Sequence, residues 1–303
     1  MPFTYAIADL HGRYDLLSEA VTKIVEHSKS DRPATIITLG DYVDRGPKSR
    51  QVIERLMDWG SPDLKLVCLK GNHEDIMWQC CRQPIKAGWW MDNGGGATLI
   101  SYGQNYGDIV NVKVVPEQHL RWIEELPLMH VDRHRVYVHA GVDPDLPLAA
   151  QDPDQLLWKL YKGPDQRGHG RRHVVHGHHQ FRDGPVTIEG RTNLDTQAWY
   201  TGRLVIGQLH RSRPEPRLST FERCWLSGAT GLAQRTGDTR DLFALRSPGS
   251  VSPLCPTCAP VKANGAARKA DSNSGIRERA MYLRYCDNSH WLRQNVPAET
   301  VRV

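Results

Sequence analysis

The chain has 303 residues, enough to bury a substantial core in one large domain or two smaller ones. Its net charge of +5 comes from the tail: residues 211–303 hold 15 Lys and Arg against 8 Asp and Glu, whereas residues 1–210 hold 24 against 26. We therefore expect no specific nucleic-acid surface on residues 1–210. The sequence has no apolar run of membrane-spanning length and its first residues lack a secretory signal, which predicts a cytoplasmic protein with no membrane partner.

The first 80 residues alternate between strand patterns and helix patterns. Residues 3–8 form a short apolar run, and from Tyr14 the apolar residues recur at helical spacing up to about His27. The same unit returns twice, as strands at 34–39 and 64–69 followed by helices over 48–57 and from 74 onward. Each of the three strands ends in polar residues, and α/β sheets place their active sites at such ends.

The middle and the end of the chain are less regular. Residues 87–107 are rich in Gly and aromatic residues and predict an insertion of loops and short helices. Within it, Trp89 and Trp90 are interpreted as packing under a loop. Later strands are expected at 135–139, 173–175 and 204–209.

From residue 211 the composition changes. Residues 211–280 are dense in Arg, Ser, Pro, Gly and Ala without a sustained period, so no packed core is predicted there, and one short helix is predicted over 281–293. We therefore divide the chain into a catalytic domain, 1–210, and a basic tail of low order, 211–303.

The seven cysteines are few and scattered, so we expect reduced thiols and no disulfide framework. Cys255 and Cys258 have the CxxC spacing of a zinc or redox site. Because no second CxxC pair accompanies them, they are interpreted as two thiols in the tail.

Five short polar motifs follow predicted strands. Between them they offer carboxylates, imidazoles and one amide oxygen, with no thiolate, which is the donor set that a pair of borderline-hard divalent metals requires. The motifs are Asp9-Leu-His11-Gly, Gly40-Asp41-Tyr-Val-Asp44-Arg45-Gly46, Gly71-Asn72-His73-Glu74, His139-Ala-Gly141 and Gly177-His178.

In order and spacing these motifs resemble those of the calcineurin-like metallophosphoesterases, in particular the bacterial and phage lambda-type Ser/Thr protein phosphatases. Asn93-Gly94-Gly95, Leu156-Leu157-Trp158 and Asn193-Leu-Asp195-Thr also resemble this family, over residues 3–210 in all. The resemblance implies an α/β (α+β) fold of four layers, with two packed mixed β-sheets flanked by helices.

The resemblance also implies roles for the motif residues. Asp9 and His11 would bind a first metal, Asp41 would bridge two metals, and a second metal would be completed by Asn72, His139 and His178. Mn²⁺ is the expected metal, with Fe or Zn as alternatives. A hydroxide held between two such ions would attack phosphorus directly, because metal charge lowers the pKa of bound water.

Three further residues are implied to be catalytic. Arg45 would bind a phosphate oxygen with its guanidinium fork. His73 would protonate the leaving alcohol as general acid, and Asp44 would orient that imidazole.

The sequence departs from the family pattern around the expected substrate rim. Leu160 stands where the family usually has an arginine, and His179 and Gln197 replace a Thr and a Gly. The second phosphate-binding cation is therefore open among four residues, namely Lys159, Lys162, Arg171 and Arg172.

Three functions are weighed. The first is hydrolysis of phosphoserine and phosphothreonine in a phosphorylated protein partner. The second is symmetrical hydrolysis of dinucleoside tetraphosphates, whose hydrolases commonly lack the acidic residue found here as Asp44. The third is a weakly active protein that binds phosphate and a partner. The sequence leaves the oligomeric state and the role of the tail open.

Overall fold

The structure is a computed structural model that describes residues 3–29, 33–83, 87–161, 167–210, 215–222 and 233–235. The chain divides into two units, Met1–Thr239 and Arg240–Val303, and all described residues belong to the first. The strands are β1 (Thr4–Ile7), β2 (Ala34–Thr38), β3 (Leu64–Cys68), β4 (Met129–Val131), β5 (Arg135–Val138), β6 (His173–His176), β7 (Val186–Ile188), β8 (Arg191–Asn193), β9 (Arg203–Leu209), β10 (Arg217–Glu222) and β11 (Ala233–Arg235). The helices are α1 (Tyr14–His27), α2 (Ser49–Met57), α3 (Asn72–Arg82), α4 (Ala87–Asp92), α5 (Gly95–Ser101), α6 (Glu117–Glu125), α7 (Pro153–Trp158) and α8 (Ala198–Thr201), with short 3-10 turns η2 (Val112–Val114) and η3 (Leu148–Ala150).

The strands form two mixed sheets. The first has the order β11-β10-β9-β1-β2-β3, in which β1, β2 and β3 are parallel and β9 runs antiparallel to β1. The second has the order β4-β5-β6-β8-β7, in which β5, β6 and β8 are parallel. Because parallel strands all end at the same edge of their sheet, the loops that follow β1, β2 and β3 begin side by side.

The two faces of the first sheet pack against different partners. Successive side chains of a strand point to opposite faces, so Ile36 and Ile37 of β2 enter different cores. Ile36 packs with apolar residues of α1 and α2, whereas Ile37 packs with Tyr137 and Val175 of the second sheet. The two sheets therefore share one buried core.

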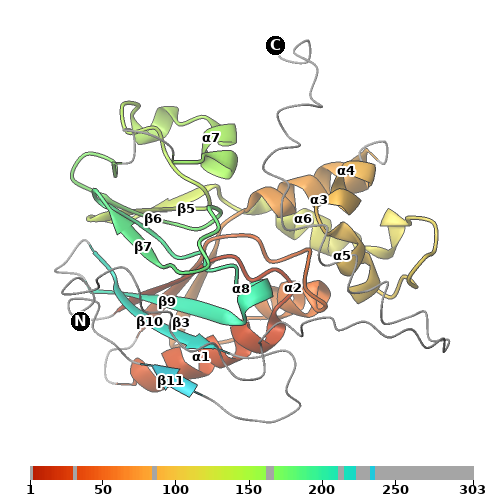
Figure 1. Ribbon diagram of the computed structural model, residues 1–303, viewed down its shortest axis with the longest axis horizontal. Helices are drawn as coiled ribbons and strands as arrows, with labels where there is room; N and C mark the ends of the chain where they lie inside the picture. Colours follow the sequence, from red (N-terminus) through yellow and green to blue (C-terminus); the bar gives the residue numbers. More distant parts are fainter. Residues whose placement is uncertain are drawn as a thin grey trace, which may run out of the picture. The chain divides into compact units, whose positions relative to one another are not determined.

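Helices cover the outer faces of both sheets, as Figure 1 shows for α1 and α2 on the first sheet and α7 on the second. The apolar residues of α1 recur at helical spacing, so Leu16, Leu17, Ala20 and Ile24 are all buried against the sheet. On the second sheet, Leu156 of α7 packs on Val136, Val138 and Val174. The predicted fold of two mixed sheets flanked by helices is confirmed.

The elements predicted in the first 80 residues agree with the structure to within one or two residues. The helix expected over 14–27 is α1, and the insertion at 87–107 consists of α4, α5 and loops. The helix expected from residue 74 begins earlier, at Asn72, so two polar motif residues belong to its first turn.

The first sheet continues past residue 210, where the sequence predicted no packed structure. β10 pairs antiparallel with β9 from Arg217 to Glu222, and β11 pairs with β10. The domain boundary at residue 210 stays a prediction. The helix predicted over 281–293, Cys255 and Cys258 lie outside the described residues.

Two further predictions concern the described part of the chain alone. Its three cysteines, Cys68, Cys80 and Cys81, are free thiols. Across the same residues, no helix is both long enough and apolar enough to cross a bilayer.

Candidate metal centre

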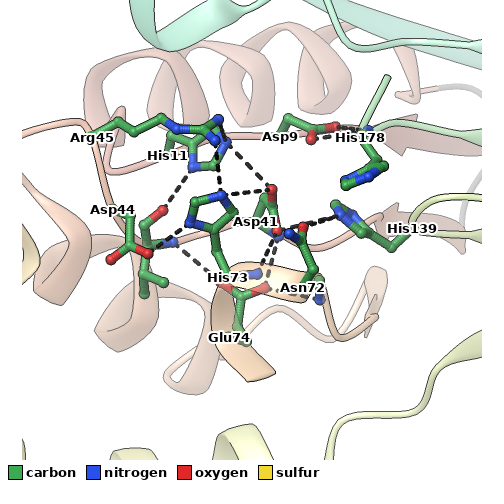
Figure 2. Close-up of polar contacts among 12 residues, drawn as sticks. Asp9, His11, Asp41, Asp44, Arg45, Asn72, His73, Glu74, His139 and His178 are labelled. Carbon is green, nitrogen blue, oxygen red and sulfur yellow. Dashed lines mark hydrogen bonds and ion pairs between the residues drawn. The ribbon is translucent and has the colours of Figure 1, made fainter. Parts of the chain in front are cut away.

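The loops that follow β1, β2, β3, β5 and β6 bring all nine predicted site residues to one place. Figure 2 shows His11 and Arg45 beside His73, and Asp9 beside His178, around a central Asp41. All nine side chains lie in the interior or at the edge of the site, and those of Asp9, His11, Asp41, Asp44, Asn72, His73 and His139 are buried. Motifs that are up to 169 residues apart in sequence therefore form a single polar cluster.

Asp41 lies between two groups of imidazoles. Its Oδ2 atom is 3.3 Å from Nε2 of His11 and 3.9 Å from Nε2 of His73, while its Oδ1 atom is 3.4 Å from Nε2 of His139. Two sets of potential ligand atoms, each within 4.8 Å of one another, share this carboxylate: His11, Asp41 and His73, and Asp41, His139 and His178. Each oxygen of Asp41 thus faces a different set.

Backbone carbonyls fix which nitrogen of two imidazoles has the lone pair. Nδ1 of His11 donates to the Val43 carbonyl and Nδ1 of His139 donates to the Leu39 carbonyl, both at 2.8 Å. Burial lowers the pKa of His11 well below its usual range and that of His139 to about 4, so both rings are neutral. Their Nε2 atoms face the site unprotonated, as metal-ligating histidines require.

For the carboxylates in the cluster, the effect of burial on the pKa exceeds the opposing effect of the Arg45 charge. Burial raises the pKa of Asp41 to about 7, and burial together with the charges of Asp195 and Asp41 raises the pKa of Asp9 well above its usual range. The unprotonated Nε2 of His139 also faces the side-chain oxygen of Asn72 at 2.8 Å. Converging carboxylates and acceptor atoms are stabilised by cations, so the residues present fit a divalent metal pair.

Asp9 is placed differently from the other predicted ligand of the first metal. Both of its carboxylate oxygens accept from the backbone N–H of His178, at 3.0 and 3.1 Å. The set that contains His11 has His73, and not Asp9, as its third member. The roles of Asp9 and the other ligands stay predictions.

The backbone of the site is strained. Non-glycine residues rarely adopt positive φ angles, yet Asp9, His11, Asp41, Asp44, Arg45 and His178 all do, with φ between 39° and 71°. Such conformations cost about 1–3 kcal/mol each and persist where surrounding contacts hold them. Because these conformations are locally unfavourable, their concentration in these loops indicates that contacts of the site side chains hold the backbone in this conformation.

His73 and Asp44 form a buried pair beside Arg45. Nδ1 of His73 donates to Oδ2 of Asp44 at 2.7 Å, and both side chains are almost fully buried. The Arg45 guanidinium donates to Nε2 of His11 at 2.6 Å and to Nε2 of His73 at 2.9 Å. Its face also lies 5.6 Å from the ring of Trp199. The three residues predicted to be catalytic are thus in contact with one another and with the metal-ligand set.

Glu74 is a site residue to which the sequence assigned no role. Its fully buried carboxylate accepts hydrogen bonds from four backbone N–H groups, those of Asp41, Tyr42, Val43 and Gly71. These bonds join the loop after β2 to the start of α3. Gly71 lies so close to Asp41 that any side chain there would collide with the Asp41 carboxylate. A Glu at the third position of a helix is the only available sequence sign, and it is common in ordinary helix caps.

Of the residues that depart from the family pattern, His179 and Gln197 are partly buried and Leu160 is exposed. Gln197 has a left-handed backbone just before α8, where its side-chain oxygen accepts from Arg182 and its amide donates to Gln180. Tyr200, one turn further, is 47% exposed and has the Arg182 guanidinium 4.5 Å from its ring centre.

The second phosphate-binding cation stays open. The Arg172 Nε atom donates to the Asp132 carbonyl at 3.3 Å, whereas Arg171 is exposed and Lys162 is outside the described residues. Lys159 follows Trp158, whose ring lies 6.1 Å from that of His178. Of the described candidates, Lys159 is the one that adjoins a ring in contact with a metal-centre residue.

Known proteins with similar sequences include dinucleoside tetraphosphatases and serine/threonine-protein phosphatases. The chain is 28% identical over 165 residues to a symmetrical bis(5'-nucleosyl)-tetraphosphatase of Dechloromonas aromatica, which covers 54% of this chain and 53% of that protein. It is 24% identical over 209 residues to serine/threonine-protein phosphatase 2 of Escherichia coli, which covers 66% of this chain and 89% of that protein. The chain thus spans about half of the tetraphosphatase and most of the phosphatase.

The fold and the family model agree with each other. A solved structure, named as a candidate diadenosine tetraphosphatase, matches with a TM-score of 0.52 and 19% identity over 73% of this chain and 96% of that one. This likeness shows the fold. The family model described as calcineurin-like phosphoesterase matches residues 4–212, which contain every residue of the metal centre. The chain therefore belongs to the calcineurin-like phosphoesterase family.

Proposed function

We propose that the chain is a metal-dependent phosphomonoesterase that removes phosphate from phosphoserine and phosphothreonine in proteins. The observation that carries this proposal is the buried His73–Asp44 pair, which lies beside Arg45 at the edge of the metal-ligand set. An alkoxide is a poor leaving group, so release of a serine or threonine side chain requires a proton donor. His73 is placed to be that donor.

The metals would be held by the predicted ligands, Asp9, His11, Asp41, Asn72, His139 and His178, and we propose Mn²⁺ as the working ion. When bound, two divalent cations supply an activated water and neutralise phosphate charge. Asp41 would contact both ions, because its two oxygens face different imidazole sets. His11 and His139 would present their unprotonated Nε2 atoms, each held in place by a carbonyl at Nδ1.

Proton transfer and phosphate binding would use three side chains. Asp44 accepts from Nδ1 of His73, so the proton given to the leaving oxygen would come from Nε2. This nitrogen accepts from Arg45 in the structure and would become a donor when the ring is protonated. Asp44 would stabilise the positive charge of the protonated ring. With metal and ester bound, the Arg45 guanidinium would exchange its bonds to His11 and His73 for two hydrogen bonds to phosphate oxygens and so orient the ester.

Relatives named as protein phosphatases support a phosphoprotein substrate. Besides the Escherichia coli protein, serine/threonine-protein phosphatase 1 of Salmonella typhimurium aligns over 91% of its length at 23% identity. The symmetrical tetraphosphatase of Dechloromonas aromatica aligns over 53% of its length, whereas an asymmetrical tetraphosphatase of Bacillus cereus aligns over 87% of its own. A phosphorylated protein is accordingly the partner that we propose.

A symmetrical dinucleoside tetraphosphatase is the second candidate. It is favoured by the relatives of that name and by the exposed ring of Tyr200, which lies one residue beyond Trp199 at the rim. An exposed aromatic ring offers a surface on which a nucleobase can stack, at about 1–3 kcal/mol per base.

A parallel assay separates the two candidates. The full chain with Mn²⁺ would be given a phosphoserine peptide and diadenosine tetraphosphate, and kcat/KM measured for each. We expect the peptide to be preferred by at least about tenfold, and preference for the dinucleotide would overturn the protein-substrate proposal. The variant Tyr200→Ala is the control: a loss of roughly tenfold on the dinucleotide alone supports the second candidate.

A further inference from the structure

The Asp44 carboxylate is held by more than His73. It is completely buried, and its two oxygens have different partners. Oδ2 accepts from Nδ1 of His73 at 2.7 Å. Oδ1 accepts from the Trp90 indole N–H at 2.9 Å and from the Thr98 hydroxyl at 2.7 Å. These two donors come from α4 and α5, the insertion that follows the core helix α3.

The Thr98 hydroxyl contacts Asp44 twice. Its oxygen accepts from the Asp44 backbone N–H at 2.8 Å, while its proton goes to the carboxylate of the same residue. The Ser49 hydroxyl oxygen also accepts from the Asp44 backbone N–H, at 3.2 Å. Backbone and side chain of Asp44 are therefore both fixed, although the residue has a left-handed φ of 71°.

The turn between α4 and α5 contacts the loop after β2, which contains Asp44 and Arg45. Gly94, with φ of 98°, accepts from the Arg45 backbone N–H at 3.2 Å, and a Cβ atom there would lie 2.9 Å from that nitrogen. A Cβ on Gly95 would lie 2.6 Å from the Trp90 ring. The two glycines thus allow the insertion to approach Asp44 and Arg45 closely enough for the Trp90 and Thr98 bonds to form.

We propose that Trp90 and Thr98 are positioning residues for proton donation by His73. They act through Asp44: both donate to Oδ1, so Oδ2 faces His73 and the buried carboxylate does not rotate about its Cβ–Cγ bond. This keeps the His73 ring in the orientation that directs Nε2 toward the site. The inference rests on the proposed function, because it assumes that His73 is the proton donor.

The proposal departs from the packing role that the sequence suggested for both tryptophans. Trp89, on the same helix, has such a role, since its ring stacks on Trp158 at 6.0 Å between centres. Trp90 has in addition a hydrogen bond to a buried anion, and bonds to charged groups contribute more than bonds between neutral groups. Replacing its indole with a benzene ring removes this bond and keeps most of the packed surface.

The test compares the full chain with its Trp90→Phe variant on two aryl phosphates in Mn²⁺. Phenyl phosphate needs its leaving oxygen protonated, whereas p-nitrophenyl phosphate needs this much less. We expect kcat on phenyl phosphate to fall by roughly tenfold with KM unchanged, and kcat on p-nitrophenyl phosphate to fall by less than about twofold. Equal losses on both substrates would overturn the proposal.

One matched control and a second pair of variants accompany Trp90→Phe. Trp78→Phe removes a buried indole N–H that has no hydrogen-bond partner among the described residues, so it should leave both substrates unaffected. Thr98→Val should reproduce the selective loss seen with Trp90→Phe, and Thr98→Ser, which restores the hydroxyl, should recover activity. If Trp90→Phe does not fold, the two Thr98 variants decide the question in the same way.

A measurement on the metal-free protein tests the contact without activity. The chain has nine tryptophans, so the indole N–H region of a nitrogen–proton NMR spectrum contains up to nine signals. The signal lost in Trp90→Phe should be strongly protected from solvent exchange and should shift more than any other in Asp44→Asn. An unprotected signal, or one that Asp44→Asn leaves in place, would contradict the inferred bond.

Failure of the inference differs from failure of the proposed function. If His73→Ala shows the selective loss on phenyl phosphate and Trp90→Phe does not, only the positioning role is wrong. If His73→Ala loses no more activity on phenyl phosphate than on p-nitrophenyl phosphate, His73 is not the proton donor, and the positioning role is overturned together with the proposed mechanism.

Discussion

Among the residues of the metal centre, Glu74 contributes mainly to the structure of the loops. Glu74 binds four backbone N–H groups of two loops that carry Asp41, Asn72 and His73. Burial and the nearby Asp41 charge raise its pKa to about 8, and hydrogen bonds from Tyr42 and Gly71 oppose that rise. Because all four donors meet its two oxygens, a side chain with an NH₂ group in place of one oxygen cannot replace this link between the loops fully.

Replacement of this carboxylate by an amide should loosen the site. In Glu74→Gln, an NH₂ group would face backbone N–H donors, and we expect a loss of about 2–3 kcal/mol in the free energy of unfolding. Urea denaturation of the metal-free full chain measures it. Asp75→Asn is the control, because Asp75 is only partly buried and its carboxylate accepts from Gln79 within α3. Equal stability of the two variants would show that Glu74 does not join the loops.

The sequence identified the residues that have a distinctive chemistry, and it missed those that support them. Asp41, His73 and Arg45 stand in motifs whose spacing indicates a metal site, and the structure brings them together. Trp90 and Thr98 have ordinary signals of a packed insertion, since nothing in their spacing shows that they reach Asp44, 46 and 54 residues away. Contacts of this kind depend on how α4 and α5 fold back, which a local pattern does not contain.

At the scale of elements, Gly95 of α5 is a position where added volume would act on Trp90 and, through it, on the His73–Asp44 pair. Gly95→Ala would place a Cβ 2.6 Å from the Trp90 ring, so we expect a loss of about 1–3 kcal/mol in stability and a selective loss of activity on phenyl phosphate. Thermal unfolding and the two-substrate assay measure these effects.

The next residue provides the matched control. A Cβ on Gly96 would meet only the Met91 sulfur, at 4.0 Å, so Gly96→Ala should keep full activity. Its stability should rise by up to about 0.5–1 kcal/mol, because alanine loses less backbone entropy in a helix. If both alanine variants behave alike, close packing on Trp90 does not matter.

Strands and helices were predictable to different degrees for a physical reason. The buried strands β1, β2 and β3 and the amphipathic helix α1 have apolar patterns that fix their type locally. β10, by contrast, has the polar sequence Arg-Leu-Ser-Thr-Phe-Glu and becomes a strand by pairing along β9. Strands at or near a sheet edge carry weaker patterns, because less of their surface is buried.

At the scale of the whole molecule, the two-sheet arrangement explains why the site is where it is. Parallel strands of both sheets deliver their following loops to one region, where Asp9, Asp41 and Asn72 come from the first sheet and His139 and His178 from the second. A shared core that includes Ile37 and Tyr137 fixes the two sheets together. The metal centre therefore depends on the packing of the sheets as well as on its own loops.

The excess positive charge and the metal centre lie in different parts of the sequence. All residues of the metal centre lie within residues 4–212, the part that matches the family model, and the excess of Lys and Arg lies beyond residue 210. The basic character of the chain is thus no guide to the substrate of the site. We expect substrate choice to depend instead on the residues around the site, where Gln197 and Leu160 depart from the family pattern.

Metal dependence of the full chain tests the central claim most directly. The protein would be stripped with a chelator and titrated with Mn²⁺, while hydrolysis of p-nitrophenyl phosphate and bound metal are measured together. The wild type should be inactive when stripped and should regain activity as about two Mn²⁺ per chain bind. Asp41→Asn should bind less metal and lose at least about 100-fold in activity, since even residues that only support metal ligands cost about 10–100-fold. Asp145→Asn, at an exposed pair with Arg167, should match the wild type. Full activity of the stripped protein, or of Asp41→Asn, would contradict the account.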